Sequence, residues 1–335
     1  MYYQNQPVLV TGATGLVGSN LIQRLLEQGA NVRATLHHRP PVVVDDRIEY
    51  VTTDLTKAED CRRVVEGRSL VFMCAATTSG AGVLAATPMA HVTPNVLMNT
   101  QMLEAAYNAG VSKFLWLSST TSYPSSGSRP VKEEEIFEGE PYNAYYYVGW
   151  MKRFTEALCR MYGDKLSKPM TTVVVRPTNI YGPGDDFEPA TSHVTAALIR
   201  KVVERQDPLE VWGTGDDVRD IIYVDDIVEI IMEATERTEA YATFNAGLGQ
   251  AYSVKEILQY ILELDGCFRP NITFNSLKPS MIPIRLVDTS KAENILGFKA
   301  RTGLREGLEK TIEWYRDSRT LPRASGASGE PKSGR

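Results

Sequence analysis

Short apolar runs alternate with longer amphipathic segments over the first 180 residues of the chain. Five of these runs are rich in β-branched and other apolar residues and carry few charges, which is typical of strands buried on both faces of a parallel sheet. The predicted strands are PVLVTG (7–12), NVRATL (31–36), SLVFMCA (69–75), KFLWLSS (113–119) and MTTVVVRPT (170–178).

Helical segments separate these runs. GSNLIQRLLEQG (18–29) and NVLMNTQMLEAAYNAG (95–110) carry apolar residues at helical spacing. Each ends at a glycine, Gly29 or Gly110, of the kind that caps a helix C-terminus. The regular alternation of strand and helix predicts an α/β fold built on a doubly wound parallel sheet.

The segment VLVTGATGLVGSNLI (8–22) places three glycines between the first predicted strand and the first predicted helix. Gly12 would allow a tight turn, Gly15 would let a pyrophosphate approach the backbone, and Gly18 would let helix and sheet pack closely. The pattern predicts a Rossmann-type dinucleotide site. A glycine-rich turn without a ligand is the alternative.

The end of the second predicted strand indicates which dinucleotide is preferred. Sites that prefer NAD usually carry an acidic residue here, which accepts the ribose hydroxyls. This chain has His37, His38 and Arg39 instead. Because a 2′-phosphate would meet cations there, we expect NADP(H) to be favoured over NAD(H). Ordinary solvated basic residues are the alternative.

The regular alternation weakens after Tyr181, where turn-rich segments such as GPGDDFEPATS (182–192) interrupt it. We therefore predict a smaller second lobe that binds the substrate. The predicted division is 1–178 for the NADP(H)-binding domain with 223–262 returning to it, 179–222 and 263–318 for the substrate-binding lobe, and 319–335 for a disordered tail.

Composition excludes several other classes of protein. The 335 residues have a formal net charge of -5, which gives no basic surface for nucleic acid. Four scattered cysteines without a C-x-x-C pair favour neither a metal site nor a disulfide framework. No stretch has the length and apolar character of a membrane span, and the amino terminus does not resemble a secretory signal. We therefore expect a cytoplasmic protein.

Together, the motifs resemble those of the extended short-chain dehydrogenase/reductase family of nucleotide-sugar epimerases and dehydratases. Within that family the resemblance is greatest to the GDP-L-fucose synthases, and it extends from about Val8 to Trp314. It implies a two-lobed fold, a nicotinamide cofactor and a nucleotide-sugar substrate. The motifs that carry it are TGATGLVG, TTDLT, MCAATT, LSSTTSYP, RPTNIYGPGDDF, SHVTAALI and VWGTGDDVRDIIYVDD.

The resemblance also implies roles for individual residues. Ser119 matches the serine that hydrogen-bonds the reacting sugar oxygen, and Lys152 matches the lysine that binds the nicotinamide ribose and lowers the pKa of a catalytic tyrosine. His193 matches a catalytic acid-base residue. The implied substrate-binding residues are Thr121, Asn179, Trp212, Arg219 and Arg285, of which Arg219 would grip the diphosphate. The implied cofactor-binding residues are Gly12, Thr14, Gly15, Leu16, Gly18, His38, Arg39, Asp54, Leu55, Ala75, Ala76 and Lys152. Surface ion pairing is the alternative for both arginines.

Two positions depart from the family pattern. Thr121 stands where the synthases have a catalytic cysteine, and a threonine hydroxyl is too weakly acidic to exchange protons readily. This disfavours double epimerisation and leaves ketone reduction or C4 epimerisation. Val148 stands four residues before Lys152, where the family has its tyrosine. A catalytically weak NADP(H)-binding module with a regulatory or binding role is therefore the alternative to an enzyme.

Tyr145 is our candidate to replace the missing tyrosine. On a helix of about 100° per residue, a residue seven before Lys152 lies about 20° from it, whereas Tyr146 and Tyr147 lie about 120° and 140° away. The same spacing occurs in divergent members of the superfamily. If the preceding loop is irregular, Tyr146 or Tyr147 would turn inward instead, and an aromatic cluster that only packs the core is a further alternative.

These observations predict an NAD(P)-dependent nucleotide-sugar epimerase or 4-keto reductase, with GDP-sugars favoured among the substrates. We expect a homodimer formed by the helices that begin near Pro94 and Val148, because their apolar surface exceeds what one sheet face needs and the family commonly pairs these helices.

Overall fold

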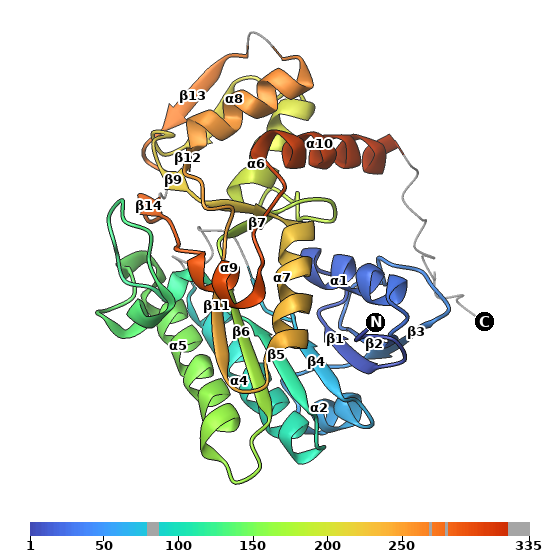
Figure 1. Ribbon diagram of the computed structural model, residues 1–335. Helices are drawn as coiled ribbons and strands as arrows, with labels where there is room; N and C mark the ends of the chain where they lie inside the picture. Colours follow the sequence, from blue (N-terminus) through green and yellow to red (C-terminus); the bar gives the residue numbers. More distant parts are fainter. Residues whose placement is uncertain (79–86, 268–269, 279–280, 321–335) are drawn as a thin grey trace, which may run out of the picture.

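The computed structural model of the protein describes residues 1–78, 87–267, 270–278 and 281–320. Its larger lobe is built on a seven-stranded parallel sheet with the spatial order β11-β6-β5-β4-β1-β2-β3 (Figure 1). This order is that of a doubly wound Rossmann-type sheet, as predicted. The strands are β1 Pro7–Thr11, β2 Asn31–Leu36, β3 Ile48–Thr52, β4 Leu70–Met73, β5 Lys113–Leu117, β6 Thr171–Pro177 and β11 Ala242–Ala246.

The five strands predicted from apolar runs are all present within one to two residues at each end, and two strands were not predicted. Strand β3 (IEYVT) contains the charged Glu49 and is only partly buried, because it forms one edge of the sheet. Strand β11 (ATFNA) forms the other edge, and the polar Asn245 interrupts its apolar pattern. Edge strands need less apolar surface than central strands, so the signal that identified the other five was weaker here.

Helices cover both faces of the sheet (Figure 1). One face packs against α1, α7 and α9, whose apolar residues share a core with β1, β2 and β11. The other face packs against α2, α4 and α5. These helices are α1 Leu16–Glu27, α2 Ala58–Val65, α4 Met89–Asn108, α5 Tyr146–Arg160, α7 Val224–Arg237 and α9 Ser290–Leu296.

The smaller lobe has a separate hydrophobic core, formed by three helices and several short strands (Figure 1). Strand β7 pairs with β10, β8 pairs with β13, and β9 lies between β12 and β14. The helices are α6 Val194–Val203, α8 Val254–Asp265 and α10 Leu304–Thr320. The strands are β7 Asn179–Tyr181, β8 Leu209–Trp212, β9 Val218–Arg219, β10 Ile221–Tyr223, β12 Tyr252–Ser253, β13 Ile272–Asn275 and β14 Ile284–Arg285.

The two lobes are interleaved along the chain, and the packing moves two of the predicted boundaries. The return to the large sheet, predicted for 223–262, ends with β11, because Ile257 and Ile261 of α8 pack in the core of the smaller lobe. Helix α9 lies within the predicted substrate lobe but packs in the core of the larger one. Residues 321–335 of the predicted tail lie outside the described residues, and the two residues before them belong to α10.

The path of the chain determines where a ligand can bind. Strand β1 has β2 on one side and β4 on the other, so the strand order reverses there, and ligands of such sheets bind outside the carboxyl ends of the strands at this point. Three short turns of helix follow β5 before α5 begins: η1 Thr120–Ser122, η2 Glu133–Phe137 and η3 Asn143–Tyr145. Within the described ranges, no helix is both long enough and apolar enough to cross a bilayer.

Candidate active site

The glycine turn between β1 and α1 fits the phosphates of a dinucleotide. Gly12 has a φ of 72°, and a Cβ there would lie 2.8 Å from the backbone of Ala75. A Cβ on Gly18 would lie 2.2 Å from the carbonyl oxygen of Gly12. Packing within the protein therefore explains both glycines. Gly15 is different, because a Cβ there would meet only one atom, at 3.5 Å, so the protein itself does not require a glycine.

The N-terminus of α1 is open for an anion. Gly15 precedes the helix without a side-chain cap, and the first turn contains no acidic residue. The free backbone N–H groups and the helix dipole favour negative charge at this position. Thr11 accepts hydrogen bonds from the backbone N–H groups of Cys74 and Ala75, which holds the end of β4 against the glycine turn. The structure thus brings the glycine turn, with Thr14 and Leu16, next to the predicted cofactor residues Ala75 and Ala76.

Basic residues are exposed at the carboxyl end of β2. His37, His38 and Arg39 all face solvent, and the two imidazole rings lie 3.5 Å apart. The predicted adenine contacts Asp54 and Leu55 follow the neighbouring strand β3. Hydrogen bonds from Thr56, aided by the charge of His37, hold the pKa of Asp54 below its usual value. Cations therefore lie beyond β2 and a carboxylate lies beyond β3.

Ser119 and Lys152 meet at the end of β5. The Ser119 hydroxyl oxygen accepts a hydrogen bond of 3.2 Å from the backbone N–H of Thr121 and so caps η1. We call residues 118–123 the serine turn. On α5, the Lys152 ammonium donates to the carbonyl oxygen of Leu117 at 3.3 Å and lies 4.8 Å from the centre of the Trp116 ring. Burial lowers the pKa of Lys152 to about 8, and the nearby carboxylate of Glu156 opposes this change.

Tyr145 lies in the short turn η3, directly before α5 begins at Tyr146. The helical geometry used in the sequence analysis therefore does not extend to it. Burial raises the pKa of its hydroxyl, while the charges of Arg219 and Arg285 lower it. Tyr146 and Tyr147 are 38% and 63% exposed. Of the three consecutive tyrosines, Tyr145 is the one that faces the smaller lobe. Among the described contacts, no hydrogen bond joins it to Lys152.

Arg219 and Arg285 lie side by side in the smaller lobe, where β9 and β14 pair in parallel. Both are buried, with 7% and 3% of their surface exposed. Arg219 pairs with Asp217 at 3.1 Å, whereas Arg285 donates to the carbonyl oxygens of Tyr123 and Pro124. Burial lowers the pKa of Arg285 to about 10, and its Nε has no hydrogen-bond partner. These adjacent buried cations beside Tyr145 form a candidate anion site.

The remaining predicted residues occupy different surroundings. The Thr121 hydroxyl is buried without a hydrogen-bond partner, and Asn179 opens β7 half-buried. His193 precedes α6 with an exposed ring; the surrounding protein lowers its pKa below 6.5, and the charge of Asp186 opposes this change. Trp212 ends β8 with 43% of its surface exposed. None of the described hydrogen bonds links His193 to Ser119, so the structure does not join these two predicted catalytic residues directly.

Three residues around the site, Gly149, Glu156 and Arg176, were not predicted from sequence to have a role. Gly149 of α5 packs against the serine turn, since a Cβ there would lie 2.8 Å from the carbonyl oxygen of Thr121. Glu156 and Arg176 form a buried ion pair next to the same turn. A signal was present for Arg176, because a lone arginine inside the apolar run TTVVVRP needs a buried partner. Nothing local marks Gly149.

The chain belongs to the NAD-dependent epimerase/dehydratase family, whose model matches residues 8–247. Several proteins are similar to this chain over nearly their whole length. The probable GDP-L-fucose synthase 1 of Oryza sativa subsp. japonica is 31% identical over 317 residues, covering 92% of this chain and 91% of the relative. A dTDP-4-dehydro-6-deoxy-D-allose reductase of a Streptomyces species is 28% identical, covering 94% and 97%. Among solved structures, MoeE5 in complex with UDP-glucose and NAD is 30% identical with a TM-score of 0.82, covering 93% and 99%.

Proposed function

We propose that this protein is an NAD(P)-dependent nucleotide-sugar 4-keto reductase or 4-epimerase. The observation that supports the proposal is that Tyr145 lies close enough to the buried cations Arg219 and Arg285 for their charges to act on its hydroxyl. Ser119 and Lys152 lie at the end of β5, the strand next to β4, whose end contacts the glycine turn. A sugar whose diphosphate is bound by the arginines would extend towards Ser119 and the cofactor turn.

The side chains present suit hydride chemistry at a sugar carbon that bears oxygen. A bound nicotinamide would donate or accept the hydride. Ser119 would hydrogen-bond the sugar oxygen, and Tyr145 would transfer the proton of that oxygen. The cationic groups of Arg219 and Arg285 stabilise the tyrosinate left after the transfer. Lys152 would hold the nicotinamide ribose, as the family resemblance implies.

Thr121 limits the chemistry to one carbon. Its hydroxyl lies buried beside the serine turn and is too weakly acidic to exchange a proton with a sugar carbon near neutral pH. Desolvation by the surrounding protein lowers the pKa of His193, which favours the neutral imidazole that can act as a base. A single base without an acid partner does not support epimerisation at two carbons. This supports reduction or C4 epimerisation.

Direct assay of candidate substrates tests the proposal. Purified protein would be incubated with NADPH or NADP and with GDP-, UDP-, dTDP- or CDP-sugars and their 4-keto derivatives, and products identified by mass spectrometry. We expect turnover of at least one sugar, with GDP-sugars favoured by the sequence resemblance. Ligand-induced thermal stabilisation without any product would support the alternative, a catalytically weak NADP(H)-binding module, which the valine at position 148 favours.

Cofactor preference depends on the exposed cations after β2. We expect NADPH to bind more tightly than NADH, and Arg39→Ala to remove most of the difference. One charge-assisted contact to a phosphate contributes about 1.5–3 kcal/mol, or roughly ten- to a hundredfold in affinity. Isothermal titration calorimetry with both cofactors measures this.

A matched control for Arg39 is Arg237→Ala. Arg237 ends α7, and Lys113 binds the neighbouring carbonyls of Thr235 and Glu236, so Arg237 lies near the amino ends of the strands. It is therefore far from the cofactor turn, and both affinities should stay unchanged in this variant. Equal affinities for NADPH and NADH in the wild-type protein would refute the cofactor prediction.

An apolar stripe on α5 supports a homodimer. Tyr147, Trp150, Phe154 and Met161 follow helical spacing along α5 and the turn after it, and each is 37% or more exposed. Leu97 on the adjacent helix α4 is 42% exposed. An apolar surface of this kind is unusual on a monomer and suits a helical interface between two copies.

We expect Phe154→Glu to convert the dimer to a monomer, because a buried, unpaired carboxylate at an interface is strongly unfavourable. Sedimentation velocity at micromolar concentration measures the oligomeric state. The control is Ile295→Glu, since Ile295 is 59% exposed on α9, outside the stripe, and its replacement should leave the dimer intact. A monomeric wild-type protein would contradict the prediction.

A further inference from the structure

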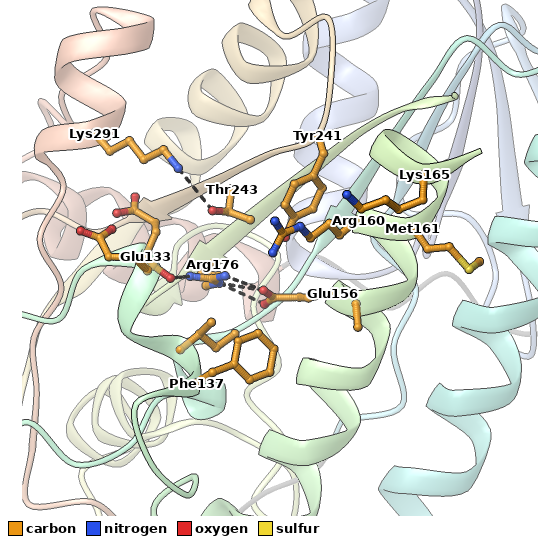
Figure 2. Close-up of a pocket in the computed structure, with 13 residues that line it drawn as sticks. Glu133, Phe137, Glu156, Arg160, Met161, Lys165, Arg176, Tyr241, Thr243 and Lys291 are labelled. Carbon is orange, nitrogen blue, oxygen red and sulfur yellow. Dashed lines mark hydrogen bonds and ion pairs between the residues drawn. The ribbon is translucent and has the colours of Figure 1, made fainter. Parts of the chain in front are cut away.

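A chain of buried hydrogen bonds runs behind the serine turn. The Ser118 hydroxyl donates to Glu156 at 2.6 Å, and Glu156 accepts from the Arg176 guanidinium at 2.5 to 3.1 Å. Arg176 also donates to the Tyr123 hydroxyl at 2.6 Å, which in turn donates to Asn245 at 2.6 Å. The chain therefore connects both ends of the serine turn to α5, β6 and β11. Figure 2 shows the bonds between Arg176 and Glu156.

The ion pair at the centre of this chain is almost completely buried. Both side chains are 2% exposed. Burial alone would lower the pKa of Arg176, but the charge of Glu156 and the hydrogen bonds to Glu156 and Tyr123 raise it above its usual value, so the guanidinium stays charged. Buried ion pairs of this kind are often no more stabilising than apolar residues of the same size. Stability alone is therefore a weak reason for charge at these two positions.

Glu156 also acts on Lys152, one helical turn before it on α5. Burial lowers the pKa of Lys152 to about 8, and the Glu156 carboxylate is the group that opposes this. The other charged or titratable groups around Glu156 are Arg176, Tyr123, Glu133, Arg153, Cys159 and Tyr241. Arg176 is already bound to Glu156 through three hydrogen bonds.

We propose that Glu156 is a positioning residue of the active site, which fixes the serine turn through Ser118 and keeps Lys152 positively charged, while Arg176 holds Glu156 in place. This inference rests on the proposed function only in taking Ser119 and Lys152 as reactive residues. Glu156 touches neither substrate nor cofactor in this role. It acts by fixing the position of the serine turn and by maintaining the positive charge of Lys152.

The protein should still fold when Glu156, or both Glu156 and Arg176, are replaced by uncharged residues. Glu156 and Arg176 contribute to the wall of a cavity of about 590 Å³, into which Arg160, Lys165 and Tyr241 also extend (Figure 2). Because the charged side chains of Arg160 and Lys165 line this cavity, water that enters it can solvate a polar group that has lost its partner. Glutamine is close in shape to glutamate and can still accept the hydrogen bond from Ser118.

The test compares Glu156→Gln with the double variant Glu156→Gln, Arg176→Gln. Competitive labelling with acetic anhydride from pH 6 to 11, followed by peptide mass spectrometry, gives the pKa of individual lysines without any enzyme assay. We expect a pKa near 8 for Lys152 in the wild-type protein. Loss of the Glu156 charge should lower it by about 1 in Glu156→Gln, and by less in the double variant, which also loses the positive charge of Arg176.

The double variant separates positioning from a structural role. Removing both charges eliminates the unpaired arginine of the single variant, so thermal stability should recover, yet the pKa of Lys152 should stay below the wild-type value. Lys310, which pairs with Glu306 on the exposed surface of α10, serves as an internal standard in the same digest. A Lys152 pKa in Glu156→Gln equal to that of the wild-type protein would show that the pair is only structural and would overturn the proposal. A wild-type Lys152 that titrates like Lys310 would overturn it as well.

Activity gives a second readout once a substrate is known. Lys152 loses its positive charge as pH rises through its pKa, so a lower pKa makes the loss begin at lower pH. The fall in kcat/KM with rising pH should therefore begin about one pH unit lower in the Glu156→Gln variant than in the wild-type protein. Absence of turnover with every nucleotide sugar would count against the proposed function but would leave the labelling result valid.

Discussion

Replacing Tyr145 by phenylalanine should reduce turnover by roughly 10²–10⁴-fold, the usual contribution of a positioned proton donor. The hydroxyl is the only group removed, and it faces Arg219 and Arg285 at the junction of the two lobes. Affinity for the cofactor should remain almost unchanged, because the glycine turn and the end of β2 do not involve this residue. Steady-state kinetics and cofactor titration on the same preparation measure both quantities.

Tyr147→Phe is the matched control for this experiment. Tyr147 is 63% exposed on the apolar stripe of α5, so loss of its hydroxyl should leave most of the activity. If the results of the two variants were exchanged, Tyr147 would be the donor. If neither variant lost activity, no tyrosine of this segment would be catalytic, and His193 would be the next residue to replace.

Arg219→Gln should weaken binding of the nucleotide sugar by roughly ten- to a hundredfold, because a buried guanidinium bound to a phosphate contributes about 1.5–3 kcal/mol. The effect should be seen in KM and in the Kd of the nucleoside diphosphate alone. Arg219 lies in the smaller lobe, so the affinity for NADPH should be unaffected. Calorimetric titration with GDP, UDP and dTDP measures the loss and identifies the preferred base.

Two further variants make the Arg219 result specific. Arg301→Gln removes an arginine whose side chain is 76% exposed, and it should change no affinity. Arg219→Lys keeps the charge but loses the planar fork, and it should recover only part of the binding. Unchanged diphosphate affinity in Arg219→Gln, with a thermal midpoint like that of the wild-type protein, would remove Arg219 from the substrate site.

The larger lobe was predictable from sequence because its central strands are buried on both faces. Runs such as PVLVT and LVFM have no polar face, so burial alone identifies them. The smaller lobe gave a weak signal, because several of its strands have only two or three residues, as in Val218–Arg219 and Ile284–Arg285. Such short strands pair only when segments distant in sequence come together, and they are too short to show the alternation of apolar and polar residues that identifies a strand.

The candidate site was predictable from sequence in its cofactor turn but not in its catalytic surroundings. The cofactor turn is one continuous segment, and its geometry follows from the position of its glycines. The surroundings of Tyr145 were not predictable, since its neighbours Arg219 and Arg285 are more than 70 residues away in sequence. The pairing of Glu156 with Arg176 was also hidden, because a helix position and a strand position have no fixed spacing that would relate them.

The interleaving of the two lobes imposes an order on folding as the chain leaves the ribosome. The larger sheet has all seven strands once β11 has been synthesised. The core of the smaller lobe still lacks Leu308 and Ile312 of α10, which pack with residues of α6 and α8. Its assembly must wait for nearly the last described residues, and contacts so distant in sequence form slowly. The nascent chain therefore completes the sheet of the half that receives the cofactor first; helix α9 joins that half later, and the core of the half that receives the sugar is completed last.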